Sequence, residues 1–306
     1  MERLLGKIEG SEKGPLVVCV AGLHGNEQIG IHAFRNVFSA IQKHSIKIKG
    51  KLVGFCGNIS AITTNRRYID YDMNRVWFDH ILEDISKGQS PIGAESKQVE
   101  ELYHAIEAEL VGGDYTCLIF ADLHATSSVN GNFVVIPEDE ADHPVIKSLK
   151  LPVVLEIDKY LEGTLLAYYH KKGFISFAFE GGTIGTEHVY QLHTSGLWEI
   201  LDKAGMISEH DHEVEDHYAN LLASVGAGLP RSVAILYHHK VKPTDQFRML
   251  PGYKNFQPIH KGQHLAIDYA GNILAPFDGM IFMPLYQSEG EDGFFIVEEV
   301  KANISV

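Results

Sequence analysis

The chain has 306 residues, about twice the usual size of one domain, so we expect two domains or one large domain with an additional part. Its 26 basic and 40 acidic side chains give a net charge of -14, which argues against nucleic acid and anionic membranes as partners. No apolar run approaches the roughly 18 residues that a membrane helix needs, and the N-terminal segment lacks the features of a signal peptide. We therefore expect a cytoplasmic protein.

The predicted elements alternate between strands and helices along the first three quarters of the chain. Short, β-branched apolar runs indicate strands, and apolar residues spaced by three and four indicate helices. In chain order we expect a strand at 15–22, a helix at 27–43, a strand at 51–57, a polar loop at 58–74, a helix at 94–111, strands at 117–121, 132–136 and 174–179, and helices at 187–204 and 214–225. This alternation predicts an α/β fold with a mixed, mainly parallel sheet flanked by helices.

The pattern changes after Gly228. From Arg231 to Val306, short β-type runs alternate with turn pairs such as Pro251-Gly252, and no helical spacing is present. We therefore divide the chain into a first domain, 1–228, and a small C-terminal all-β domain, 229–306, that caps it.

Residues that bind metals or transfer protons follow three of the predicted strands. His24 and Glu27 follow the first, Asp122 and His124 follow a later one, and Glu180 follows the last. Ligands of open parallel sheets bind outside the carboxyl ends of the strands, so these side chains are expected to meet although they are far apart in sequence.

His24, Glu27 and His124 form a ligand set typical of zinc enzymes. Two histidines and a glutamate leave a fourth position open for a water molecule, as in catalytic zinc sites. Asp122 is placed to accept the second imidazole N–H of His124, and Glu180 remains available as a base. An H-x-x-E pair is common by chance, but the joint placement of three segments favours one Zn²⁺ per chain.

Four strings occur in an order that resembles a known family: AGLHGNE (21–27), RRYIDYDMNR (66–75), DLHATSS (122–128) and FEGG (179–182). The chain resembles the succinylglutamate desuccinylase/aspartoacylase family, relatives of the zinc carboxypeptidases. The resemblance spans nearly the whole chain, including the late string MPLYQSEGEDGFF (283–295). It implies a zinc carboxypeptidase-like catalytic domain, zinc bound by His24, Glu27 and His124, and Glu180 as the general base.

The activity that the resemblance implies is zinc-dependent hydrolysis of the amide bond of a small, anionic N-acyl amino acid. Two alternatives stay open: a carboxypeptidase-like peptidase or esterase that uses the same zinc site, and a non-catalytic metal-binding protein. The sequence leaves the acyl group, the amino acid and homo-oligomer formation open.

The string RRYIDYDMNR holds three arginines against two aspartates, a positive excess that suits an anionic ligand. The arginines can instead pair internally with Asp70 and Asp72. The resemblance implies that Arg67, Asn74 and Arg75 contact the substrate. It also implies that one of the two arginines, for which we take Arg67, polarises the scissile carbonyl oxygen.

Two segments of the sequence bear on substrate specificity. Aspartoacylases carry a further substrate-binding arginine about ten residues before the catalytic glutamate, where this chain has His170, Lys171 and Lys172. This departure puts the identity of the substrate in doubt but not the reaction type. By resemblance, Tyr286 is expected to contact the substrate from a loop, the alternative being a tyrosine packed between the domains.

Overall fold

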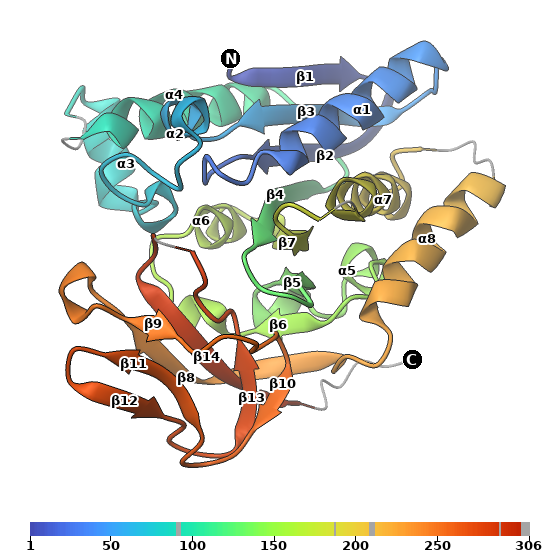
Figure 1. Cartoon of the computed structure of the whole chain (residues 1–306). Coiled ribbons are helices and arrows are strands. Elements are labelled where there is room, and N and C mark those ends of the chain that lie inside the picture. Colours follow the sequence, from blue (N-terminus) through green and yellow to red (C-terminus); the bar gives the residue numbers. More distant parts are fainter. Residues whose placement is uncertain (90–92, 187, 208–211, 288, 301–306) are drawn as a thin grey trace.

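The computed structural model describes residues 1–89, 93–186, 188–207, 212–287 and 289–300. An eleven-stranded sheet runs through most of the molecule (Figure 1). In sheet order its strands are β1 (Leu4–Glu9), β3 (Lys49–Cys56), β2 (Glu12–Ala21), β4 (Leu118–Thr126), β7 (Ile175–Thr183), β5 (Asn132–Val135), β6 (Val153–Leu155), β8 (Ser232–Lys240), β14 (Asp292–Glu299), β13 (Gly279–Phe282) and β10 (Gln257–Ile259). A second sheet contains β12 (Gly271–Leu274), β11 (His264–Asp268) and β9 (Arg248–Met249).

The centre of the large sheet is parallel. β3, β2, β4 and β7 pair in parallel, and after one antiparallel contact between β7 and β5, the strands β5, β6 and β8 pair in parallel again. The predicted mixed, mainly parallel α/β sheet is confirmed.

Helices cover both faces of this sheet because its central strands are apolar on both sides. Along β2, Val17 and Cys19 face one apolar cluster, whereas Leu16 and Val18 face the other. The first cluster includes residues of α1 (Ile29–Lys43), α5 (Pro144–Ser148), α7 (His188–Lys203) and α8 (His212–Gly226). The second includes residues of α3 (Asp79–Ser86), α4 (Ala94–Leu110) and α6 (Leu165–Lys171).

The C-terminal β-rich region continues the large sheet. β8 pairs in parallel with β6, and β14, β13 and β10 follow in antiparallel order. The β-rich C-terminal region expected from the turn pairs is confirmed, and the structure adds that β8, β14, β13 and β10 pair in antiparallel order. The predicted boundary between 228 and 229 falls between α8 and β8, so backbone hydrogen bonds of one sheet link the two parts, and the division into two domains stays a prediction.

Several element boundaries differ from those expected. β4 continues to Thr126 and β7 to Thr183, because the two strands keep pairing beyond the apolar runs that predicted them. The polar loop contains a short helix, α2 (Ile59–Thr64), whose first turn is capped by Asn58. The strands β1 and β6 and the helices α3, α5 and α6 were not predicted. Positions 187, 288 and 301–306 of the expected elements lie outside the described residues.

In the part of the chain that the structure describes, no helix has both the length and the apolar character required to span a membrane.

Candidate active site

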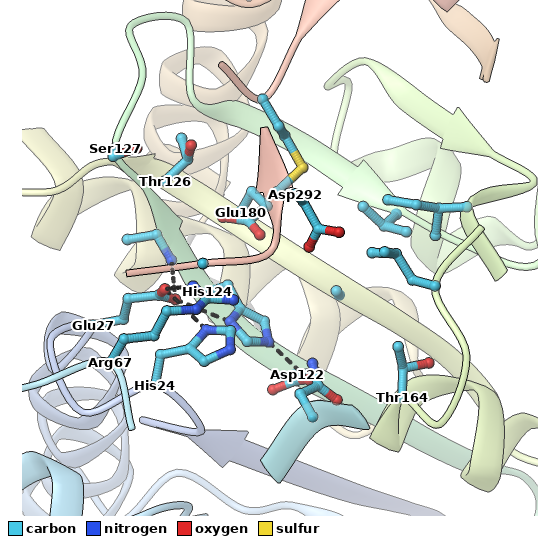
Figure 2. Close-up of a pocket in the computed structure, with 18 of the residues that line it drawn as sticks. His24, Glu27, Arg67, Asp122, His124, Thr126, Ser127, Thr164, Glu180 and Asp292 are labelled. Carbon is cyan, nitrogen blue, oxygen red and sulfur yellow. Dashed lines mark hydrogen bonds and ion pairs between the residues drawn. The ribbon is translucent and has the colours of Figure 1, made fainter. Parts of the chain in front are cut away.

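Two histidines lie against one buried carboxylate near the carboxyl ends of the parallel strands β2 and β4 (Figure 2). His24 and Glu27 lie in the turn that follows β2, and His124 lies on β4. The Nδ1 atom of His24 is 2.9 Å from Oε1 of Glu27, and the Nδ1 atom of His124 is 2.9 Å from Oε2. One ligand atom from each residue lies within 4.8 Å of the others. The structure thus brings together the three predicted metal ligands.

The outer nitrogen of each histidine faces a second carboxylate. Nε2 of His124 lies 2.8 Å from Oδ2 of Asp122, the contact expected from the sequence. Nε2 of His24 lies 3.2 Å from Oδ1 of Asp72, which was expected only as a partner of the arginines. Carboxylates in this position orient an imidazole ring and make its inner nitrogen a better ligand.

Burial and neighbouring charges have opposite effects on the pKa values of Glu27 and His124. Burial alone would raise the pKa of Glu27 and lower that of His124. The two neighbouring histidines nevertheless hold the pKa of Glu27 well below its usual range. Asp122 and Glu27 hold the pKa of His124 well above its usual value. The buried carboxylates therefore favour positive charge at the centre of the cluster.

Glu180 lies beside the cluster on β7, where its Cα atom is paired with that of His124 on β4. The side chain is buried, and among the described residues its Oε2 atom has no hydrogen-bond partner. Burial raises the pKa of Glu180 to about 7, although His124 acts in the opposite direction. A carboxyl group with these properties is suited to accept a proton and return it near neutral pH.

A buried histidine supports the backbone at this point. His193, on α7, places one ring nitrogen 2.9 Å from the carbonyl oxygen of Val189 and the other 3.0 Å from that of His124. Burial lowers the pKa of His193 to about 4. Gly181 leaves room for this ring, because a Cβ atom there would lie 2.2 Å from its Nδ1 atom.

Arg67 is held against the cluster by two carboxylates. Its Nη2 atom donates to Oδ2 of Asp72 at 3.0 Å, and its Nη1 atom lies 3.5 Å from Oε1 of Glu27. Burial acts to lower the pKa of Arg67, but these carboxylates raise it overall. Its Nε atom is buried without a hydrogen-bond partner among the described residues. The internal pairing considered from the sequence is thus present for Arg67, and one donor remains unused.

Asn74 and Arg75 line the same pocket but are also engaged elsewhere. The side-chain oxygen of Asn74 accepts the backbone N–H of Leu165 at 2.8 Å. Arg75 donates through Nη2 to Oδ2 of Asp292 at 2.7 Å, and Oδ1 of Asp292 lies 2.8 Å from Nε2 of His238. The predicted substrate residue Arg75 is therefore neutralised by a carboxylate of the C-terminal region.

The segment between β13 and β14 contacts the loop that contains the arginines. Arg66 donates through Nε and Nη2 to Oε1 of Glu289 at 3.0 and 2.8 Å, and the backbone N–H of Arg67 donates to Oε2 at 3.1 Å. Asn26 donates to the side-chain oxygen of Gln287 at 3.1 Å. The C-terminal region therefore supplies part of the pocket wall.

Tyr286 does not line this pocket. Its hydroxyl group accepts the backbone N–H of Tyr253 at 2.8 Å and donates to the carbonyl oxygen of Leu250 at 2.9 Å. The basic string at the end of α6, 170–172, is also outside the pocket, and His170 lies 3.3 Å from an oxygen of Asp139. The substrate contact inferred for Tyr286 stays a prediction that this arrangement does not support.

Glu95 organises the arginine-containing loop, a role that the sequence did not reveal. It lies at the start of α4 and is completely buried. Its carboxylate accepts the backbone N–H groups of Ile69 at 2.6 Å, Asp70 at 3.0 Å and Tyr71 at 3.3 Å, and the side-chain amide of Asn58 at 3.0 Å. One side chain thus fixes the path of the loop that carries the predicted substrate residues.

We expect Glu95→Gln to lower the free energy of unfolding by about 1–3 kcal/mol, because the new amide group turns a donor toward buried N–H donors. Urea unfolding monitored by circular dichroism measures the change. Glu83→Gln, on the exposed face of α3, is the matched control and should cost less than about 0.5 kcal/mol. Equal midpoints for the two variants would contradict the role of Glu95.

Comparisons with known proteins show the family and the fold that this chain shares with them. Residues 13–194, more than half of the chain, match the model of the succinylglutamate desuccinylase/aspartoacylase catalytic domain. A probable aspartoacylase of Prochlorococcus marinus (strain NATL2A) is 27% identical over 291 residues, which are 89% of this chain and 87% of that protein.

Two solved structures have the same fold. The succinylglutamate desuccinylase of Chromobacterium violaceum superposes with a TM-score of 0.66 at 17% identity, covering 96% of this chain and 88% of that chain. The product-bound ectoine utilization protein of Ruegeria pomeroyi superposes with a TM-score of 0.67 at 14% identity, covering 95% and 87%.

The fold and the family model together define the class: the chain belongs to the succinylglutamate desuccinylase/aspartoacylase family. Both names in that description denote hydrolases that remove an acyl group. The chain is therefore a member of a family of deacylases, as its sequence motifs implied.

Proposed function

We propose that the protein is a zinc-dependent hydrolase that cleaves the amide bond of a small N-acyl amino acid. The observation that carries this proposal is the meeting of two histidine Nδ1 atoms on the carboxylate of Glu27, next to the buried carboxyl group of Glu180. A structural role alone would not explain why a carboxyl oxygen is buried there without a hydrogen bond.

The donor set fits Zn²⁺. His24, Glu27 and His124 supply two imidazole nitrogens and a carboxylate, and the surrounding aspartates favour positive charge between them. We propose one zinc ion per chain, held by these three residues. Zinc in such a site activates water as a nucleophile and polarises the carbonyl group of the substrate.

Four side chains of the pocket supply the other catalytic and binding functions. Glu180 accepts the proton of the attacking water through its unbonded oxygen and then returns it to the leaving amine. Arg67 stabilises the negative charge that develops on the carbonyl oxygen, for which its unused Nε–H is a suitable donor. Asn74 and Arg75 bind the carboxylate of the amino acid. Residues 1–228 would then form the catalytic part, and 229–306 would cover it.

A hydrolysis assay tests the proposed activity. The zinc-loaded protein is expected to release free amino acid from at least one member of a panel of N-acetyl, N-succinyl and longer N-acyl amino acids, measured with an amine-reactive fluorophore. The same protein with Glu180→Gln is the control for contaminating hydrolases. Release that is equal in the two samples, or absent from both, would contradict the proposed function.

We expect Arg75→Ala to lower kcat/KM about 10- to 100-fold for an N-acyl amino acid but far less for its neutral amide analogue, because only the former offers a carboxylate. Arg66→Ala is the matched control, since Arg66 lies in the same loop but outside the pocket. Equal losses on the acid and its amide would mean that Arg75 only supports the loop through Asp292.

A further inference from the structure

The lining of the candidate active-site pocket contains two groups of side chains of different chemistry. The histidines, Glu180 and Arg67 form the polar group. The apolar group, which we call the apolar end of the pocket, comes from four separate segments and consists of Val135, Ile157, Leu161, Leu166, Ala178 and Met283. Three of these, Val135, Ile157 and Leu161, belong to a buried apolar cluster shared with the C-terminal strands, so the wall is a fixed part of the core.

The pocket lining changes from polar to apolar between two neighbouring side chains on the same face of β7. Ala178 and Glu180 are two residues apart on β7, so their side chains point to the same face. Val135 on β5 is the Cα partner of Ala178, which places an isopropyl group beside the methyl group. Ala178 therefore lies between Val135 and the carboxylate-bearing Asp122, its Cα partner on β4, so the apolar surface begins at Ala178 and extends toward β5.

The positive side chains of the pocket are already neutralised. Among its described lining residues, the lysines and arginines are Arg67 and Arg75 alone. Arg67 faces Asp72 and Glu27, and Arg75 faces Asp292. One substrate carboxylate can compete for these guanidinium groups, but a second carboxylate at the apolar end would be buried without a partner, which is unfavourable.

The geometry points to a substrate with one carboxylate and one uncharged apolar group that occupies the end of the pocket formed by the six side chains above. This inference rests on the proposed hydrolysis of N-acyl amino acids and names the substrate class. The apolar group has two chemical sources, the side chain of a neutral amino acid or the acyl chain.

A substrate series distinguishes the sources. The zinc-loaded protein is assayed on N-acetylglycine, N-acetyl-leucine, N-hexanoylglycine, N-acetylaspartate and N-succinylglutamate. We expect kcat/KM for N-acetyl-leucine or for N-hexanoylglycine to exceed that for N-acetylglycine and for both acidic compounds at least about 10-fold. The favoured member identifies the source of the apolar group.

A substitution that fills the apolar end of the pocket provides a second test. Ala178→Leu is expected to lower the ratio of kcat/KM for the favoured apolar substrate to kcat/KM for N-acetylglycine at least about 10-fold, because the added side chain occupies the space that the apolar group needs. Ala178→Gly, which adds no volume, is the control. If Ala178→Leu does not fold, the selectivity of the unmodified protein decides alone.

Binding provides a readout that does not depend on turnover. Glu180→Gln, loaded with zinc, is titrated calorimetrically with N-acetyl-leucine, N-hexanoylglycine and N-acetylaspartate, and an apolar compound is expected to bind at least about 10-fold more tightly than the acidic one. Preference for an acidic compound in turnover and binding would overturn this inference and leave the proposed function intact. Hydrolysis of none of the five compounds would overturn the proposed function and this inference with it.

Discussion

Glu180→Gln is expected to lower kcat about 10²- to 10⁴-fold while the protein stays folded and keeps its zinc. The amide has the shape of the carboxyl group but cannot accept the proton of the attacking water, and removal of a general base has an effect of this size. The assay is amino acid release at saturating substrate, combined with zinc analysis of the same sample. A rate within about threefold of the unmodified protein would assign the base to another residue.

The pH profile gives an independent check of the same residue. A general base acts only when deprotonated, so kcat/KM should rise with pH through the pKa of Glu180 and fall about tenfold per pH unit below it. Burial raises that pKa to about 7, and a bound cation moves it downward, so the acidic limb should lie at or below pH 7. The pH profile of Glu180→Gln should lack this acidic limb. An acidic limb that persists in this variant would show that another group controls it.

His24→Ala and His124→Ala are expected to abolish stoichiometric zinc binding and to reduce hydrolysis about 10³-fold or more. Each removes one of three ligands, and the metal contributes several kcal/mol of transition-state stabilisation. Zinc is measured by elemental analysis after dialysis. Asp122→Asn should weaken zinc binding less than these variants do, by about 10- to 100-fold in affinity. It removes the hydrogen-bond partner of His124 but leaves all three ligands in place.

His32→Ala is the control for this series because His32 is exposed on α1, away from the pocket. It should keep both zinc and activity. Unchanged zinc content in His24→Ala and His124→Ala together would show that the metal lies elsewhere. Retained activity without zinc would show that the reaction needs no metal.

The sequence predicted the site residues whose positions depend on their near neighbours along the chain. His24 and Glu27 are three residues apart in one turn, so their proximity follows from backbone geometry. His124 and Glu180 were placed near them because each follows an apolar run that indicates a central strand. The expectation that both lie beyond their strands was wrong, since β4 and β7 keep pairing through them. Apolar patterning marks where a strand is buried, whereas its length depends on the partner strand.

The remaining site residues depend on contacts between distant parts of the chain. Asp292 neutralises Arg75 across 217 positions, and Glu289 contacts Arg66 across 223. No local pattern distinguishes these acidic residues from solvated ones. Glu95 looked like an ordinary polar residue of an amphipathic helix, because its backbone partners have no sequence signature. The apolar end of the pocket was missed for the same reason, as four segments assemble it only after folding.

The Cα pairing of His124 with Glu180 limits how this protein can change during evolution. Because side chains alternate along a strand, a single inserted or deleted residue in β7 would replace Glu180 in the pocket by a neighbour from the opposite face. Length changes before His124 in β4 or before Glu180 in β7 should therefore be selected against, whereas the loops that connect the strands can grow at little cost. Related proteins of altered specificity should differ in loop length and wall residues while the spacing along these two strands stays constant.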